Sequence, residues 1–590
     1  MKRFDRTSLA TAVGLAVLGL AQVTEAQTFT WTTVVNNKVT IPACASPTET
    51  RKFNSYSQPS VNEAGLVVFR GRSKGSDGGG GEGEEQIAVA AASEGEKGQP
   101  ARGVYSRDMS LAASPVSVVA CVRGEVPGPN NLVGTMEGQS PLGTFNEFPA
   151  FPRIDATSPS IATRGQSTPV WEAVTSIDTT TEPPTETTTK VGTSGVYVQL
   201  DDELLTGASL LGSVKEDFPS TDLAFPEYSV PGVGIPDGTK FDQFPGGPTI
   251  ADETFVAFKG NFSAPNPAGV VAGRTGVFFR DVSREENPTY LVANSFTTIP
   301  GSRITFGSTA PPSAANGYVF FVGSDNEDAP AAGGIYRARM DTSRSPDSPQ
   351  LLTPLVKIGK QVPTQGGGNR FTRFGEGLSV SKDGNLVAFW GTWGPQSVSK
   401  QLFCPVDGNQ AIKEECLRQY PNGYAEVQIP VNQGIFVYEV SSKEFRLIAK
   451  TGQDGFSDFL YWVFSGAPPG VGGGHEGEGG TEDREPPRWR SSAFAAVSLI
   501  DSSRFAVAFK GTQDDKPGIF LGNGLGGLTK VVQVGDPGTD VDPAAPAGSV
   551  VTALGSERDG FRGANLGITA SMLNYSTTES MSGIYLTKVR

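Results

Sequence analysis

The stretch Phe255-Val256-Ala257-Phe258-Lys259-Gly260, followed by Gly276-Val277-Phe278, is one copy of a pattern that recurs along this 590-residue sequence. The second part of the pattern, Gly-Ile/Val-Tyr/Phe, begins at Gly103, Gly195, Gly276, Gly334, Gly434, Gly518 and Gly583. The first part, an apolar run that closes in Phe-x-Gly, ends clearly at Gly71, Gly260, Gly323, Gly391 and Gly511. In the second and seventh units this part is degenerate, around Trp171 and Tyr575. Such repetition indicates a repeat architecture.

Each unit offers four runs of strand length, rich in Val, Ile, Phe and Tyr and separated by turns of Gly, Asn or Asp. A lone Phe in polar surroundings stands upstream in each unit, at Phe53, Phe145, Phe241, Phe306, Phe371, Phe456 and Phe561. One four-stranded sheet cannot bury both of its faces, whereas sheets stacked around an axis can. The sequence therefore predicts an all-β fold, a single seven-bladed β-propeller of four-stranded blades, with an open stack of sheets as the alternative.

The expected blades span approximately residues 53–127, 145–214, 241–300, 306–363, 371–452, 456–537 and 561–590 with 31–42. The N-terminal segment is included because the seventh unit stops after Gly583-Ile584-Tyr585 and lacks its fourth strand. Residues 34–42 align with residues 292–300, the last strand of the third unit. We expect this N-terminal strand to complete the last blade, which closes the ring and leaves no exposed sheet edge there.

Two stretches resemble repeats of known propeller families. Ser381-Lys382-Asp383-Gly384-Asn385-Leu386-Val387-Ala388-Phe389 resembles the blade signature of TolB-like repeats. Asn62-Glu63-Ala64-Gly65-Leu66-Val67-Val68-Phe69 is similar to the NxxGxxAF repeat of secreted bacterial proteins, with Val68 in place of Ala. The resemblance implies a secreted β-propeller and is structural only, so no functional residue is carried over from it.

The N-terminus and the charge constrain location and partners. Residues 1–26 fit a secretory signal peptide, with a basic start and an apolar run, although an uncleaved membrane anchor is the alternative. We therefore expect residues 27–590 to be secreted, extracellular or periplasmic, with no membrane association after signal removal. The formal net charge of −14 disfavours nucleic acid as a partner, because an acidic surface repels phosphates. The oligomeric state does not follow from the sequence.

The four cysteines of an exported chain tend to pair. Cys404 and Cys416 flank a short polar loop, which predicts a local disulfide. Cys44 and Cys121 are the remaining pair, although connectivity cannot be read from sequence.

Several kinds of chemistry lack the residues that they need. The single histidine, His475, lies in a Gly-rich loop, which suits neither a Ser-His-Asp triad nor a zinc site with several His ligands. Residues 324–328 form an acidic cluster, but calcium needs about six or more oxygen ligands, so we predict no cofactor or metal. Paired carboxylates could still hydrolyse glycosides.

Four aromatic residues fall in or beside the long insertions and are the candidate binding residues: Trp393, Tyr461, Trp462 and Trp489. Aromatic rings on such loops can stack on sugars or anchor a partner, or they can cover the core. We expect a binding module for an extracellular protein or glycan, held on the face that carries the insertions. The alternatives are a carboxylate-dependent polysaccharide-degrading enzyme and a structural surface protein without a small ligand. An enzyme is the less favoured of these interpretations.

Overall fold

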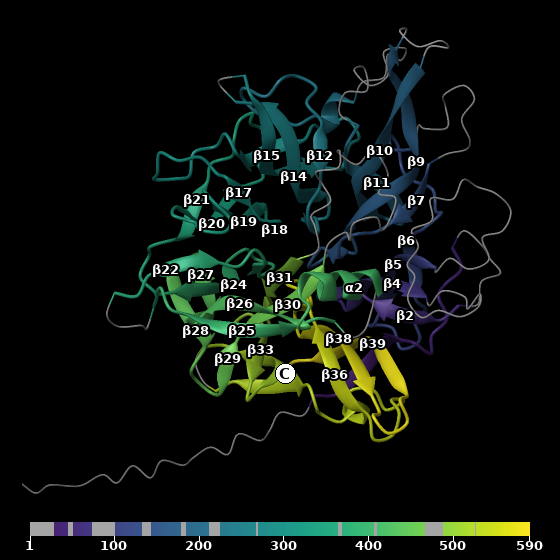
Figure 1. The fold of residues 1–590 in the computed structure, drawn as a ribbon, viewed down its shortest axis with the longest axis vertical. Helices are drawn as coiled ribbons and strands as arrows, with labels where there is room; N and C mark the ends of the chain where they lie inside the picture. The colour runs from purple at the N-terminus through teal and green to yellow at the C-terminus, as the bar shows by residue number, and fades with distance from the viewer. Residues whose placement is uncertain are drawn as a thin grey trace, which may run out of the picture.

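The computed structural model describes residues 29–44, 51–73, 101–131, 143–178, 185–211, 225–266, 269–363, 368–405, 410–465, 488–524 and 527–590. They form a ring of seven antiparallel blades, which confirms the predicted all-β, seven-bladed propeller (Figure 1). The predicted signal peptide, residues 1–26, and His475 lie outside the described residues. Within the described ranges, no helix is long and apolar enough to span a membrane.

The strands of the first four blades follow one plan. Blade one contains β2 (Phe53–Tyr56), β3 (Ser60–Val61), β4 (Leu66–Ser73), β5 (Arg102–Asp108) and β6 (Ser117–Cys121). Blade two contains β7 (Thr144–Glu147), β8 (Arg153–Ile154), β9 (Ile161–Asp178), β10 (Thr185–Leu200) and β11 (Glu203–Ser209). Blade three contains β12 (Phe241–Gln243), β13 (Thr249–Ala251), β14 (Phe255–Pro265), β15 (Val271–Asp281) and β16 (Tyr290–Asn294). Blade four contains β17 (Ser308–Thr309), β18 (Ser313–Ala315), β19 (Tyr318–Ser324), β20 (Gly333–Arg339) and β21 (Thr353–Lys357).

The last three blades add insertions and the closure. Blade five contains β22 (Phe371–Phe374), β23 (Ser379–Val380), β24 (Leu386–Trp393), β27 (Gln433–Glu439) and β28 (Glu444–Lys450). Blade six contains β29 (Phe456–Asp458), β32 (Ala495–Leu499), β33 (Phe505–Gln513), β34 (Lys516–Gly522) and β35 (Thr529–Gln533). Blade seven contains β36 (Val550–Gly555), β37 (Phe561–Arg562), β38 (Asn565–Leu573), β39 (Ser580–Lys588) and β1 (Trp31–Asn36). Short 3-10 helices lie at Pro226–Tyr228 and Gly538–Asp540.

The first strand of every blade is bent into two pieces that both pair with the second strand. The inner pieces, β3, β8, β13, β18, β23, β32 and β37, contact one another in succession, and β37 returns to contact β3. The ring is therefore closed around its axis, which excludes the open stack of sheets.

The N-terminal strand closes the ring as predicted. β1 pairs antiparallel with β39, from Trp31 opposite Thr587 to Asn36 opposite Gly583. The last residue of β1 makes the same turn contact as the last residue of β16. Asn36 Oδ1 accepts from the backbone amide of Lys38, and Asn294 Oδ1 accepts from the backbone amide of Phe296. A disulfide between Cys44 and Cys121 then joins the segment after β1 to the outer strand of blade one.

The recurring motifs form the core of each blade. Gly260 lies opposite Gly276 on the neighbouring strand, and the Phe241 ring covers Gly260 so closely that an added Cβ atom would lie 2.5 Å from Phe241 Cε1. The Phe278 ring meets Phe241 edge to face, with centroids 5.0 Å apart. Glycine is required because any side chain would occupy the space of the Phe ring. The same edge-to-face pair recurs in the other five of the first six blades, as Phe53–Tyr105, Phe145–Tyr197, Phe306–Tyr336, Phe371–Phe436 and Phe456–Phe520.

The strand register of blades two and seven explains why the Phe-x-Gly element is degenerate in their sequence units. In blade two the closing glycine is Gly165, opposite Gly195, whereas Trp171 lies further along β9. In blade seven Ala570 takes the glycine position opposite Gly583. The expectation that Phe561 begins the seventh unit is wrong, because Phe561 lies in the inner strand β37.

The residue that replaces the lone Phe in blade seven is Val551. It lies opposite Met572, two residues beyond Ala570, as Phe241 lies opposite Phe262, two residues beyond Gly260. Compared with blade three, Val551 is smaller than Phe241 and Ala570 is larger than Gly260, so the volume of the core stays similar.

Candidate binding face and the axis of the ring

Two insertions form a cap on the ring. One leaves blade five and contains β25 (Ser397–Phe403), α2 (Gln410–Gln419) and β26 (Tyr424–Pro430). The other is the hairpin of β30 (Leu460–Ser465) and β31 (Arg488–Ala493). The hairpin interrupts the first strand of blade six, between β29 and β32. Figure 1, which looks down the shortest axis, shows α2, β30 and β31 near the middle of the ring.

β25 and β26 form a two-stranded ribbon whose faces differ. Alternation along the register places Leu402 opposite Ala425 on the inner face, where both are buried. The outer face carries hydroxyl, amide and carboxylate side chains: Ser397, Ser399, Gln401, Glu426 and Gln428. The outer row ends in the cross-strand pair Phe403 and Tyr424, whose ring centroids are 5.9 Å apart. Phe403 is 68 % exposed, which is unusual for a Phe in an ordered strand.

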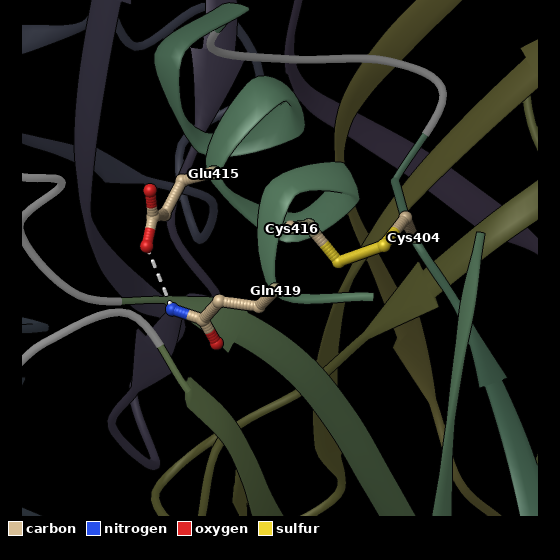
Figure 2. Close-up of a disulfide and its surroundings, with 4 residues drawn as sticks. All are labelled: Cys404, Glu415, Cys416 and Gln419. Atoms are coloured by element: carbon tan, nitrogen blue, oxygen red, sulfur yellow. Dashed lines mark hydrogen bonds between the residues drawn. A yellow bond between two sulfur atoms is a disulfide. The ribbon is translucent and has the colours of Figure 1, made fainter. Parts of the chain in front are cut away.

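A disulfide fixes α2 to the end of the ribbon. Cys404 follows β25 directly and bonds to Cys416 in α2, with Cα atoms 5.8 Å apart, which confirms the predicted pair (Figure 2). On the same helix, Gln419 Nε2 donates to Glu415 Oε1 at 2.8 Å, as Figure 2 shows, and Arg418 Nε donates to Glu415 Oε2 at 2.7 Å. The bonds from Arg418 and then Gln419 lower the pKa of Glu415. The disulfide thus holds the helix to the ribbon, and the charge-assisted contacts of Glu415 stabilise the helix internally.

The hairpin packs Phe464 and Trp489 against this disulfide. Phe464, Cys404 and Cys416 form a small buried cluster, against which Trp489 lies half-buried. The rings of Phe464 and Trp489 meet edge to face, with centroids 5.5 Å apart. Strand alternation turns Trp462 to the same side as Phe464, and the neighbouring Tyr461 points to the other side.

A buried carboxylate joins the cap to the ring. Asp458, at the end of β29, forms an ion pair with Lys400 of the ribbon. Its other oxygen accepts from Gln433 Nε2 at 3.0 Å and from the amide of Leu460 at 2.9 Å. Gln433 in turn accepts from Trp390 Nε1 at 3.2 Å. One fully hydrogen-bonded network therefore fixes the ribbon and the start of the hairpin relative to blades five and six.

The four predicted aromatic residues occupy different environments. Trp393 is 3 % exposed and lies in the core of blade five, 5.9 Å from the Phe436 ring. Trp462 and Trp489 are half-buried in the cap. Tyr461 is 45 % exposed, and one face of its ring is covered by Lys510, whose Nζ lies 3.8 Å from the centroid. Burial lowers the pKa of Lys510 to about 8.

Sequence reasoning missed Phe403 and Tyr424. The signal that could have found them is the set of polar residues at every second position, Ser397, Ser399 and Gln401, with the apolar Val398 and Leu402 between them, directly before the predicted disulfide. Such alternation predicts a strand with one exposed face, and an aromatic residue at an exposed position of that strand is then a candidate ligand contact.

The axis of the ring is filled by charged side chains. Arg153, from the inner strand β8, pairs with Asp559, and Asp559 also pairs with Arg562. Burial alone would raise the pKa of Asp559, but the guanidinium groups of Arg153 and Arg562 outweigh this effect and hold the pKa below its ordinary value. Asp559 therefore stays ionised and is unsuited to act as a general acid.

Other acidic groups are also engaged in structural contacts. Asp155 Oδ1 accepts from the amides of Thr157 and Ser158, both at 2.8 Å. In the predicted acidic cluster, Asp325 and Asn326 cap the backbone of their own turn. Within the described part of the chain, no group of three acidic, His or Cys residues is placed to hold a metal ion.

Comparisons with known proteins give weak similarity. No family model and no curated protein matches this chain. Among solved structures, an oligogalacturonate lyase in complex with manganese is similar at 8 % identity and a TM-score of 0.33, over 92 % of this chain and 98 % of that one. An oligogalacturonate lyase from Vibrio parahaemolyticus is similar at 10 % identity and a TM-score of 0.34, over 96 % and 98 % of the two chains. At this level of similarity neither structure informs the activity of this chain.

Proposed function

We propose that the chain is a secreted binding module whose ligand is a neutral extracellular polysaccharide, held on the outer face of the β25–β26 ribbon. The observation that carries this proposal is the aromatic pair of the exposed Phe403 and the half-buried Tyr424, at the end of a row of hydroxyl and amide side chains. Sugars offer apolar C–H faces that stack on aromatic rings and hydroxyl groups that both donate and accept. The disulfide and the Asp458 network supply the rigidity that such a site needs.

The charge of the protein favours a neutral ligand. The net charge of −14 repels polyanionic glycans as it repels nucleic acids. The outer row of the ribbon carries neutral groups apart from Glu426, which accepts from Gln401 Nε2 at 3.5 Å. A protein ligand would use the same aromatic pair, and the experiment below distinguishes it.

Binding is favoured over hydrolysis because of the state of the carboxylates. Glycoside hydrolysis needs two nearby carboxyl groups, one of them with a raised pKa. Burial raises the pKa of Asp242, on β12, but this carboxylate accepts from Ser263 and feels the charge of Lys240, whereas the axial Asp559 is ionised. This arrangement supports a module that retains its ligand.

The test is a panel of insoluble and soluble polysaccharides, neutral and acidic, scored for both retention of the protein and release of reducing ends. We expect retention on at least one neutral polysaccharide without release of product. The double variant Phe403→Ala/Tyr424→Ala should weaken that binding at least about tenfold, because hot-spot aromatic residues contribute 2 kcal/mol or more. Tyr575→Ala is the matched control, since Tyr575 is 73 % exposed in the β38–β39 turn of blade seven.

Three outcomes would contradict the proposal. Release of product would favour the enzyme. Retention of secreted proteins without retention of any neutral polysaccharide would favour a protein ligand. Equal binding by the double variant and by Tyr575→Ala would remove the ribbon from the site.

A further inference from the structure

Arg153 crosses the axis of the ring. It is 1 % exposed and belongs to blade two, yet it pairs with Asp559 of blade seven, and its Nη2 donates to Ser313 Oγ of blade four at 3.3 Å. Ser313 Oγ donates onward to the carbonyl of Leu378 in blade five at 2.8 Å. The guanidinium group of Arg153 therefore contacts blade seven through Asp559 and blade four through Ser313, and Ser313 links this site to blade five.

Arg558 brings a second guanidinium group to the same place. Its Nη1 donates to the carbonyl of Pro311 at 3.0 Å, two residues before the Ser313 that Arg153 contacts. Both cations therefore meet one short segment of blade four. Burial, and then the charge of Arg153, lower the pKa of Arg558 to about 10. Like charges at such proximity in a buried site are unfavourable unless an anion lies near them.

The neighbouring carboxylates do not accept from all the N–H donors of the Arg153 and Arg558 guanidinium groups. Asp559 is shared by Arg153 and Arg562, and Glu557 lies 3.6 Å from Arg558 Nε. Glu376 also acts on Arg558 through its charge but is exposed, and Asp155 acts on Arg562.

Three guanidinium nitrogens remain without a hydrogen-bond acceptor among the described residues: Arg153 Nη1, Arg558 Nε and Arg562 Nε. Buried donors are nearly always satisfied, so an acceptor that is not part of the chain is expected here.

We propose that the axis of the propeller is a binding site for a small monovalent inorganic anion of the size of chloride, held between Arg153 and Arg558. A halide fits because it accepts several N–H donors without a directional preference, and three guanidinium nitrogens here have no acceptor among the described residues. Arg153 is 1 % exposed, which excludes a polymeric ligand from this position. This site is separate from the ribbon, so its test does not depend on the proposed function.

The first experiment is diffraction from crystals of the full chain grown or soaked in bromide, recorded at the bromine absorption edge. We expect one anomalous peak on the axis, in contact with Arg153 Nη1. An axis without a peak, at a bromide concentration that labels surface sites, would overturn the proposal.

The second experiment is thermal unfolding in chloride and in gluconate at equal ionic strength. A ligand that binds the folded state raises the Tm by mass action, so we expect a higher Tm in chloride. Arg558→Gln should lose this difference, whereas Arg504→Gln, which alters an exposed ion pair with Asp501, should keep it. If Arg558→Gln does not fold, Glu376→Gln replaces it, because removal of that negative charge should increase the effect of chloride. A chloride effect that appears solely in Glu376→Gln would mean that the Glu376 carboxylate serves as the natural counter-ion, and it would overturn the proposal.

Discussion

The ring and the cap are held together in opposite ways. In the ring, an aromatic pair over a glycine recurs in six blades, and the seventh blade fills the same position with Ala570 and Val551. In the cap, one carboxylate, Asp458, joins the ribbon, the hairpin and two blades, and no second copy of this contact exists within the described chain. Each part also has its own disulfide. The contacts that stabilise the ring are therefore distributed over all blades, whereas those that attach the cap are concentrated at one residue, Asp458.

The two disulfides should differ most in their effect on stability. The Cys44–Cys121 bond closes a sequence separation of 77 residues, against 12 for Cys404–Cys416. Loop-closure entropy then predicts a loss of about 4 kcal/mol in the free energy of unfolding for Cys44→Ala/Cys121→Ala, and a smaller loss for Cys404→Ala/Cys416→Ala. Urea unfolding of both double variants under non-reducing conditions measures the difference. A larger loss for the cap pair would contradict the assignment of ring closure to Cys44 and Cys121.

A glycine of the ring should tolerate no added methyl group. Gly260→Ala places a Cβ atom 2.5 Å from Phe241 Cε1, and overpacking of this kind destabilises by about 1–3 kcal/mol. Gly273→Ala, in the same sheet, is the control, because its Cβ atom would meet nothing within 4 Å.

Blade seven shows how the damage could be repaired. The double variant Gly260→Ala/Phe241→Val reproduces the pair Ala570 and Val551, so it should be more stable than the sum of its single changes predicts. Additive losses, measured by urea unfolding, would show that the two positions are not coupled.

The junction of the cap should be sensitive to one carboxylate. Asp458→Ala removes the ion-pair partner of Lys400 and leaves Gln433 Nε2 with the Pro430 carbonyl as its acceptor, and we expect a loss of about 2 kcal/mol, reduced from the value for a fully buried pair because Lys400 is partly exposed. Asp458→Asn should lose less, since its amide oxygen can still accept from Gln433. Hydrogen exchange should show the loss in the ribbon and not in blades one to four. A uniform loss across the ring would argue against a separate cap.

The ring could be predicted because its physics is repeated. Each Phe-x-Gly and Gly-Ile-Tyr element reflects the same packing of an aromatic ring over glycine. Five clear copies of the first element were therefore enough to infer the closed ring and the place of Trp31–Asn36. The Phe-x-Gly element of blade two escaped recognition because Thr163 stands two residues before Gly165, where the clear copies have Phe. Val551 escaped because a Val at this position has no distinctive pattern.

The cap could not be predicted in the same way, because it occurs once. Trp393 looked like a surface aromatic next to an insertion, yet it is the last residue of β24 and packs in the core. Its position opposite Phe371 became evident only from the strand register. The contacts of Asp458 join segments that are far apart in sequence, and no local pattern encodes them.

The smallest effect is expected at Tyr461, where ring and cap meet. Because Lys510 covers one face of its ring, Tyr461→Ala should weaken polysaccharide binding less than Phe403→Ala and change stability at pH 7 by about 0.5 kcal/mol or less. It should, however, change the dependence of stability on pH. The pKa of Lys510 is about 8 in the folded chain, below its value when unfolded, so the unfolded chain binds more protons between pH 8 and 10 and stability rises with pH across that window. Removal of Tyr461 admits water to Lys510 and should flatten this rise in urea unfolding at pH 7.5, 8.5 and 9.5; an unchanged slope would mean that other groups bury the ammonium.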